Sequence, residues 1–193
     1  MRTFTALPLG VGLFVTLALQ SCQTRREPSL KPGQISFAIT ADSMSPTLVS
    51  GDRIMSETLY YESHVPRGGN LVILKVPRDQ QLPENVVSVQ SMLVKRVVAV
   101  GGDVVSLSAN RLRLNGIDAP EPYAHYEPVG GVVESGDFEP VKVPANHFFV
   151  LGDNRSHSLD SRHFGAIALD AIVGKPLYIY DSPDRSRIGR IIR

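Results

Sequence analysis

The chain has 193 residues, of which 42% are hydrophobic and 20% are charged, and its formal net charge is +1. This length predicts a single domain with enough chain to bury a core. The near balance of 20 basic and 19 acidic residues gives no support to nucleic-acid binding, because nucleic-acid-binding proteins usually carry clustered basic residues. One cysteine excludes an intramolecular disulfide, and 16 glycines with 14 prolines favour short strands and turns.

Residues 1–22 form an apolar segment that predicts contact with a membrane. No charged residue lies between Thr3 and Thr24, and the most apolar part runs from Ala6 to Leu19. That part has the length of a signal-peptide core and is short for a spanning helix. We therefore expect either a membrane anchor or a lipoprotein-type signal in this segment.

The only cysteine, Cys22, ends the segment in the sequence Leu-Gln-Ser-Cys, which resembles a bacterial lipoprotein processing site. One interpretation is that Cys22 becomes the lipid-bearing first residue of the mature chain. The other is a free thiol at the end of an ordinary anchor. Both interpretations place the protein at a membrane, with membrane lipids as partners.

The rest of the chain predicts an all-β domain over residues 35–181, preceded by a polar linker at residues 23–34. Apolar residues alternate at Ile35, Phe37 and Ile39, with the period of a strand. Further strands are predicted from short apolar runs, and a hairpin is predicted around Ser108-Ala109-Asn110. The runs span residues 71–76, 93–100, 104–107, 111–114, 148–151 and 172–180, and Pro176 in the last marks an edge or a bulge.

Two stretches lack this pattern. Residues 115–146 contain five prolines and little periodicity, so they predict an irregular insertion between two core strands. The basic tail at residues 182–193 has four arginines and one aspartate, which indicates either contact with anionic lipid or a solvated, frayed terminus. Fraying is the expectation we adopt for the tail.

Four segments contain residues that could take part in catalysis, and two of them hold a serine and a lysine that could act together. Ser43 follows a predicted strand and precedes Pro46, so it belongs on a turn. Lys95 interrupts an apolar run, so its amine either reaches solvent or is buried. Burial would lower the pKa of the amine from its ordinary value near 10.4 and allow it to accept a proton from a serine hydroxyl at neutral pH.

The order and spacing of the four segments resemble the bacterial type I signal peptidases, also known as leader peptidases, over most of residues 36–180. The segments are Asp42-Ser43-Met44-Ser45-Pro46-Thr47-Leu48, Arg67-Gly68-Gly69-Asn70, Lys95-Arg96, and the run from Gly152 to Arg162. This resemblance implies a signal-peptidase-like β fold and a Ser-Lys dyad. In that dyad Ser43 is the nucleophile and Lys95 is the general base.

The resemblance also implies supporting roles around the dyad. Ser158 would hydrogen-bond and orient the lysine amine, Arg96 would pair with Asp153, and Asp160 would pair with Arg162. An oxyanion donor is implied at the backbone N–H of Ser43. Some members place a serine hydroxyl two residues before the nucleophile, whereas this chain has Ala41 there.

By the same resemblance, the substrates are exported precursor proteins, cut after small residues of the Ala-x-Ala type. An extended peptide would add to a strand edge. Its side chains would enter apolar pockets formed by Met44, Leu48, Leu93 and Val94. The five histidines show no recognised ligand spacing, and neither a phosphate loop nor a dinucleotide motif is present, so we expect no metal and no cofactor.

The family implies a cell-membrane location with the catalytic domain on the extracytoplasmic side. The basic residues after the apolar segment, Arg25, Arg26 and Lys31, would by the positive-inside rule favour the opposite orientation. Two alternatives stay open for the function. One is a dedicated processing peptidase of a conjugation or pilus system, and the other is a non-catalytic relative that only binds exported peptides. The distantly related self-cleaving repressors also use Ser and Lys, but this chain lacks their DNA-binding helical domain.

Overall fold

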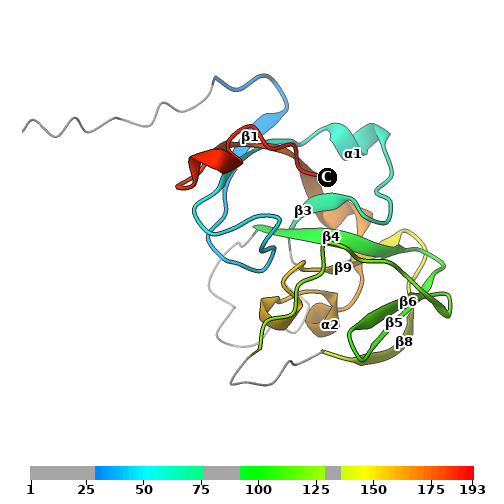
Figure 1. Ribbon diagram of the computed structural model, residues 1–193. Coiled ribbons are helices and arrows are strands. Elements are labelled where there is room, and N and C mark those ends of the chain that lie inside the picture. The colour runs from blue at the N-terminus through cyan, green and yellow to red at the C-terminus, as the bar shows by residue number, and fades with distance from the viewer. Residues whose placement is uncertain (1–28, 76–91, 129–135) are drawn as a thin grey trace, which may run out of the picture.

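The computed structural model describes residues 29–75, 92–128 and 136–193. Two antiparallel sheets account for most of the regular structure of these residues, and the helices are single turns (Figure 1). The chain is therefore mostly β, as the short apolar runs predict. The predicted membrane segment at residues 1–22, including Cys22, lies outside the described residues. Within the described ranges, no helix is long and apolar enough to cross a membrane.

The larger sheet has seven strands, and it includes every apolar run that was predicted in the first half of the chain. In spatial order the strands are β1 (Gln34–Ala38), β2 (Arg53–Glu57), β11 (Ile172–Asp181), β3 (Leu71–Lys75), β4 (Met92–Val100), β9 (His147–Leu151) and β10 (Ile167–Ala168). The continuous apolar run of β3 is explained by its position, because β11 and β4 flank it and its first four residues are buried. Pro176 of β11 borders a shift in the pairing with β2, which confirms the predicted bulge.

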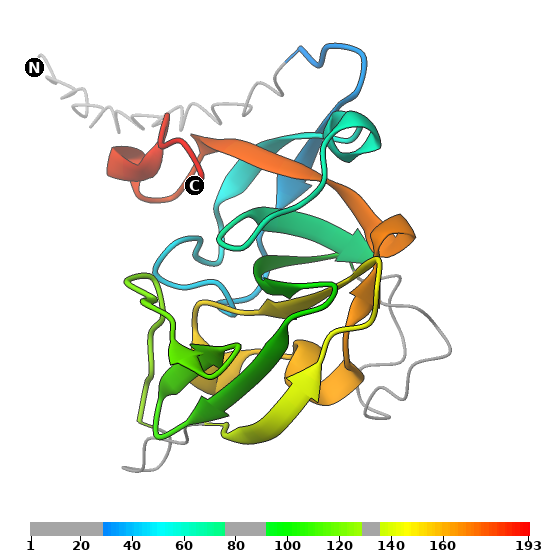
Figure 2. The ribbon, with the colours of Figure 1, turned by 90° about the vertical axis from the view of Figure 1, so that its right-hand side faces the viewer.

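The smaller sheet has four strands and packs on one side of β4 and β9 (Figure 2). Its spatial order is β7 (Ile117–Asp118), β6 (Arg111–Leu114), β5 (Val104–Ser108) and β8 (Phe138–Lys142). The predicted hairpin joins β5 to β6, and its turn residues Ala109 and Asn110 have φ of 50° and 61°. Positive φ at both central residues is the geometry that matches the twist of a two-residue hairpin.

The expectation that residues 115–146 are irregular is wrong in part. This stretch contributes β7 and β8, and β8 pairs with β5. Pro140 lies within β8 without breaking it, because β8 is an edge strand of its sheet, where a missing N–H is tolerated. Residues 129–135 of the predicted insertion lie outside the described residues.

Three clusters of buried apolar side chains hold the layers together. One lies beneath the turn between β1 and β2 and includes Met44, Leu48 and Val94. A second packs the single-turn helices α1 (Tyr60–Ser63) and α2 (Ser161–Phe164) against β3, β4 and β9. The third joins the two sheets, with residues of β4 and β9 packed against residues of β5 and β6. The first cluster matters most for function, because it anchors the turn that carries Ser43.

The tail at residues 182–193 is not frayed, and that expectation is wrong. The chain folds back after β11 through a 3-10 turn, η4 (Arg185–Arg187), toward β1 and β2 (Figure 1). The Ile179 N–H donates to the Arg190 carbonyl at 3.0 Å, and the Ile192 N–H donates to the Leu177 carbonyl at 2.9 Å. The tail is ordered because these backbone bonds are joined by an ion pair between Arg187 and Asp52.

Candidate active site

Ser43 lies on a turn whose two ends are joined by backbone hydrogen bonds and whose apolar side chains are buried in the core. At the base, the Ile39 N–H donates to the Asp52 carbonyl at 2.8 Å, and the Gly51 N–H donates to the Ile39 carbonyl at 2.9 Å. Met44 and Leu48 are 1% and 0% exposed and fix the turn in the core. Ser43 itself is half-buried.

Lys95 lies on β4, and its buried side chain reaches the Ser43 turn. Its side chain is 1% exposed, and its Nζ lies 2.6 Å from Ser43 Oγ. The two residues are 52 positions apart in the chain, so the contact depends on the fold and not on local structure. Of the two interpretations of Lys95, the buried one is therefore correct, and the amine does not reach solvent.

Burial changes the acidity of this lysine. Loss of hydration lowers the pKa of Lys95 from 10.5 to about 8, because the charged form is the one that burial disfavours. The carboxylates of Asp160 and Asp153 act in the opposite direction, and Arg162 adds to the lowering. A substantial share of the amine is therefore neutral near pH 8, and a neutral amine is able to accept the Ser43 proton.

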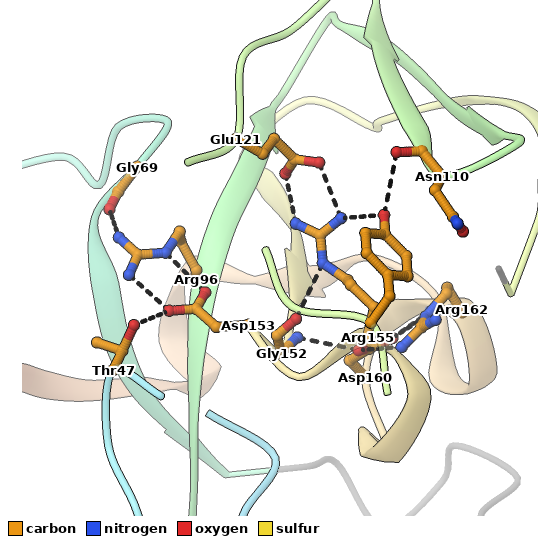
Figure 3. Close-up of polar contacts among 11 residues, drawn as sticks. Thr47, Gly69, Arg96, Asn110, Glu121, Gly152, Asp153, Arg155, Asp160 and Arg162 are labelled. Carbon is orange, nitrogen blue, oxygen red and sulfur yellow. Dashed lines mark hydrogen bonds and ion pairs between the residues drawn. The ribbon is translucent and has the colours of Figure 1, made fainter. Parts of the chain in front are cut away.

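The expected pair between Arg96 and Asp153 is present (Figure 3). Arg96 Nε and Nη2 donate to the two carboxylate oxygens at 2.8 and 2.7 Å, and Nη1 donates to the Gly69 carbonyl at 2.7 Å. Asp153 also accepts a hydrogen bond from the Thr47 hydroxyl. This carboxylate therefore ties the Ser43 turn to the strand that carries Lys95.

Asp160 and Arg162 also form the expected pair, at the base of the loop between β9 and α2 (Figure 3). Arg162 Nε and Nη2 donate to the carboxylate at 2.8 and 2.9 Å, and the Gly152 N–H donates to it at 3.0 Å. Burial by itself would raise the pKa of Asp160, but the hydrogen bonds that the carboxylate accepts, chiefly from Arg162, and the charge of Arg162 together hold the pKa below 3.8. The charged carboxylate of Asp160 therefore links Gly152, at the start of this loop, to Arg162 in α2.

Ser158 does not make the hydrogen bond that the resemblance implies. Its Oγ is buried, and among the described residues no hydrogen bond joins it to the Lys95 amine. Instead the hydroxyl packs on Gly152: a Cβ built there would lie 2.2 Å from Ser158 Oγ and 2.4 Å from the Ser43 carbonyl oxygen. The absence of a side chain at Gly152 leaves the space that the Ser158 side chain occupies.

The sequence analysis missed two buried arginines that support the site. Arg155 donates to both oxygens of Glu121, to the Gly152 carbonyl at 3.0 Å and to the Tyr126 hydroxyl at 3.3 Å (Figure 3). Arg187 pairs with Asp52 at the end of the Ser43 turn. One partner of each pair is close to a predicted segment: Arg155 lies within the run from Gly152 to Arg162, and Asp52 lies four residues after the segment that contains Ser43. The other partners lie in the proline-rich stretch and the basic tail, where no motif marks them.

The four predicted pocket residues do not gather on one surface. Met44, Leu48 and Val94 belong to one core cluster, while Leu93 packs against another. Leu93 and Val94 are neighbours on a strand, and successive side chains point to opposite faces. Met44, Leu48 and Val94 are 1%, 0% and 5% exposed, so all three serve as core in the structure.

One edge of β4 stays open beside the dyad. β4 pairs with β3 over Met92–Arg96 and with β9 only over Arg96–Val100. On the β9 side, therefore, no strand among the described residues pairs with Met92–Lys95. These backbone groups lie next to Lys95, which makes them a place where an extended peptide could add as a further strand.

The donor set of the site fits acid–base chemistry better than metal binding. In the parts of the chain that the structure describes, no three His, Cys, Asp or Glu side chains are placed to hold a metal ion. A hydroxyl 2.6 Å from a buried amine of lowered pKa is instead the arrangement of a nucleophile with its base. The geometry defines a candidate hydrolase site with serine and lysine at its centre.

Comparison with known proteins agrees with this chemistry. A family model described as "Signal peptidase, peptidase S26" matches residues 33–180. The chain is 36% identical over 149 residues to thylakoidal processing peptidase 1 of Arabidopsis thaliana, which covers 77% of this chain and 42% of that protein. It is 33% identical over 150 residues to signal peptidase I P of Bacillus subtilis subsp. natto, which covers 75% of each. It is also 33% identical over 139 residues to signal peptidase I of Leptolyngbya laminosa, covering 71% of this chain and 64% of that one. The chain belongs to the signal peptidase family, peptidase S26, a family of serine endopeptidases.

Proposed function

We propose that the protein is a membrane-bound signal peptidase that cleaves exported precursor proteins after small residues with a Ser43–Lys95 dyad. The contact of 2.6 Å between Ser43 Oγ and a buried lysine amine is the observation that carries the proposal. Family membership supports the substrate class and the extracytoplasmic side of the membrane, and the apolar segment at residues 1–22 supports attachment to a membrane.

The reaction begins with proton transfer within the dyad. Neutral Lys95 accepts the hydroxyl proton of Ser43, and Ser43 Oγ attacks the scissile carbonyl carbon. The peptide bond then breaks, and Lys95 returns the proton to the leaving amine. Water hydrolyses the resulting acyl-enzyme, with Lys95 again accepting a proton. Each step uses the same short distance and the same titrating amine.

The developing oxyanion needs donors close to the nucleophile. Among the described residues, no acceptor takes a hydrogen bond from the Ser43 N–H, so this group is available to the oxyanion. Ala41 has no side-chain donor, so the second donor in our proposal is a backbone N–H or a water molecule.

Substrate selection follows from the open edge of β4. In our proposal the precursor lies extended along Met92–Lys95, where backbone hydrogen bonds hold it and alternate side chains face the protein. Met44 and Val94, the chain neighbours of Ser43 and Lys95, are 1% and 5% exposed, so neither opens a wide pocket. In our proposal this packed surface favours a small side chain, such as alanine, at the cleavage position.

The test is incubation of the purified protein with a secretory precursor, followed by mass spectrometry of the products. We expect cleavage after the Ala-x-Ala sequence, with the rate rising with pH up to about pH 8, the pKa of Lys95. Ser43→Ala and Lys95→Ala should abolish cleavage, while Ser45→Ala on the same turn should retain it. Cleavage by Ser43→Ala would exclude the dyad. Cleavage of a single pilus-type client and of no general precursor would favour a dedicated processing peptidase instead.

A further inference from the structure

Arg187 lies in the tail, outside the residues that the family model matches, and yet it contacts the turn that carries Ser43. Its residue is 8% exposed. Nη2 donates to Asp52 Oδ2 at 2.7 Å and to the Thr47 carbonyl at 3.0 Å, Nε donates to Asp52 Oδ1 at 3.1 Å, and Nη1 donates to the Pro46 carbonyl at 3.3 Å. One guanidinium therefore binds the turn at three residues.

We propose that Arg187 is a positioning residue for the reaction: it holds the Ser43 turn at the distance from Lys95 that proton transfer requires. This inference rests on the proposed function and assigns to the tail a role in positioning the Ser43 turn for catalysis. Arg187 acts through the turn and touches neither the dyad nor a substrate.

The planar guanidinium of Arg187 is well suited to holding the Ser43 turn in one orientation. Its donors are fixed in one plane, so its contacts with a carboxylate and two carbonyls fix the orientation of the turn as well as its position. Pro46 and Thr47 follow Ser43 closely, and Asp52 ends the turn just before β2. A lysine at this position would keep the charge but could not make this set of contacts in a single geometry.

The tail also reaches the opposite half of the site. Arg96, the neighbour of Lys95, donates from Nη1 to the backbone oxygen of Arg193 at 3.1 Å. Arg96 also binds Asp153, which accepts from Thr47 on the Ser43 turn. The contacts therefore form a closed ring from the tail to the Ser43 turn, through Asp153 to β4, and back to the tail. Such a ring restrains both members of the dyad at once.

Displacement of the turn would change the surroundings of Lys95. The groups that face this amine are the Ser43 hydroxyl, the carboxylates of Asp153 and Asp160, and Arg162. If the turn moves outward, water reaches Nζ, and the pKa of Lys95 rises toward its ordinary value of 10.5 because its desolvation is relieved. A purely structural arginine would alter stability without changing this pKa.

The experiment compares Arg187→Lys and Arg187→Gln with the wild type, using the whole chain at a temperature well below the lowest melting point. With a precursor as substrate, we expect kcat to fall by about tenfold to hundredfold, the loss typical of a displaced reacting group, with KM little changed. We also expect the rising limb of the pH–rate profile to move to higher pH. Arg185→Ala is the matched control, because Arg185 is exposed on the same 3-10 turn, and it should behave as wild type.

A second measurement does not depend on activity. The side-chain carbon signal of Lys95, assigned by its loss in Lys95→Met, is titrated by NMR in ¹³C-lysine-labelled protein. We expect a midpoint near pH 8 in the wild type, and a midpoint about one pH unit higher in both Arg187 variants. Unchanged kcat and an unchanged midpoint in folded variants would overturn the proposal. Loss of the fold in both variants would also overturn it, since Arg187 would then be structural. If the wild type cleaves no precursor, the proposed function fails while the titration still tests the positioning role.

Discussion

At the scale of single residues, the burial that our proposal requires of Lys95 comes at the expense of stability. Its folded pKa is about 8 against 10.5 for the free side chain, so the unfolded chain binds more protons between these pH values. Stability therefore rises as pH increases through this window, and below it the buried ammonium costs roughly 3 kcal/mol. An active site that needs a neutral amine thus weakens the fold at neutral pH.

This cost predicts that Lys95→Met abolishes cleavage but stabilises the protein. Near pH 7 the variant should exceed the wild type in free energy of unfolding by up to about 3 kcal/mol, and the difference should vanish above pH 10.5. Urea denaturation across this pH range measures it. Lys142→Met, at an exposed position on β8, is the control and should show no such pH dependence. A gain that persists unchanged at high pH would contradict the stated cause.

Gly152 is a second residue of this kind, because the close packing around it leaves no space for a side chain. A Cβ there would clash with the Ser158 side chain and with the Ser43 carbonyl oxygen, so the Ser158 side chain and the Ser43 backbone must move. We expect Gly152→Ala to lower kcat by about a hundredfold. Gly68→Ala is the control, because a Cβ at Gly68 meets nothing within 4 Å. Precursor cleavage with both variants tests this, and near-normal activity of Gly152→Ala would refute the packing argument.

At the scale of elements, the open edge of β4 makes a prediction about substrate binding. If the precursor pairs with Met92–Lys95, then N-methylation of a peptide bond that donates to this edge should lower kcat/KM by about two- to tenfold. The measurement uses synthetic peptides methylated at successive positions. Alternation of sensitive and insensitive positions is expected, because successive N–H groups of a strand point to opposite sides. Equal sensitivity at every position would argue against strand addition.

The elements also show what a sequence can and cannot predict. β3 and β4 were predicted from continuous apolar runs, and the hairpin from its turn residues, since these signals are local. The four motifs placed Ser43 beside Lys95 and Arg96 beside Asp153 correctly. β8 was missed because Pro140 weakens its pattern, and only its pairing with β5 stabilises it. The implied hydrogen bond between Ser158 and Lys95 is not made in the structure, and the spacing of the motifs gives no signal of the close packing of Ser158 on Gly152.

At the scale of the whole molecule, buried ion pairs join parts that are distant in the chain. Arg155 of the loop after β9 pairs with Glu121 of the segment after β7, and their side chains are 0% and 6% exposed. Arg187 and Asp52 likewise join residues 135 positions apart. Such long-range pairs were invisible in the sequence, because each charged residue by itself resembles an ordinary surface residue. They explain why the basic tail is ordered.

We therefore predict that Glu121→Gln destabilises the protein by about 3–5 kcal/mol, since it leaves the Arg155 cation buried without its carboxylate. Replacing both partners, as Glu121→Leu with Arg155→Met, should restore much of the loss. Thermal and urea unfolding measure both. Asp118→Asn is the control, because its pair with Arg113 is half-exposed and should contribute no measurable stability. If Glu121→Gln resembled this control, the two regions would not be coupled.

The unpaired stretch of β4 has a consequence beyond catalysis. A row of unsatisfied backbone groups accepts any extended chain, including the same strand of another molecule. We therefore expect that, in concentrated preparations without peptide, two copies associate through this edge and block each other. A tight-binding inhibitor added during purification would then act as a solubilising agent as well as a probe.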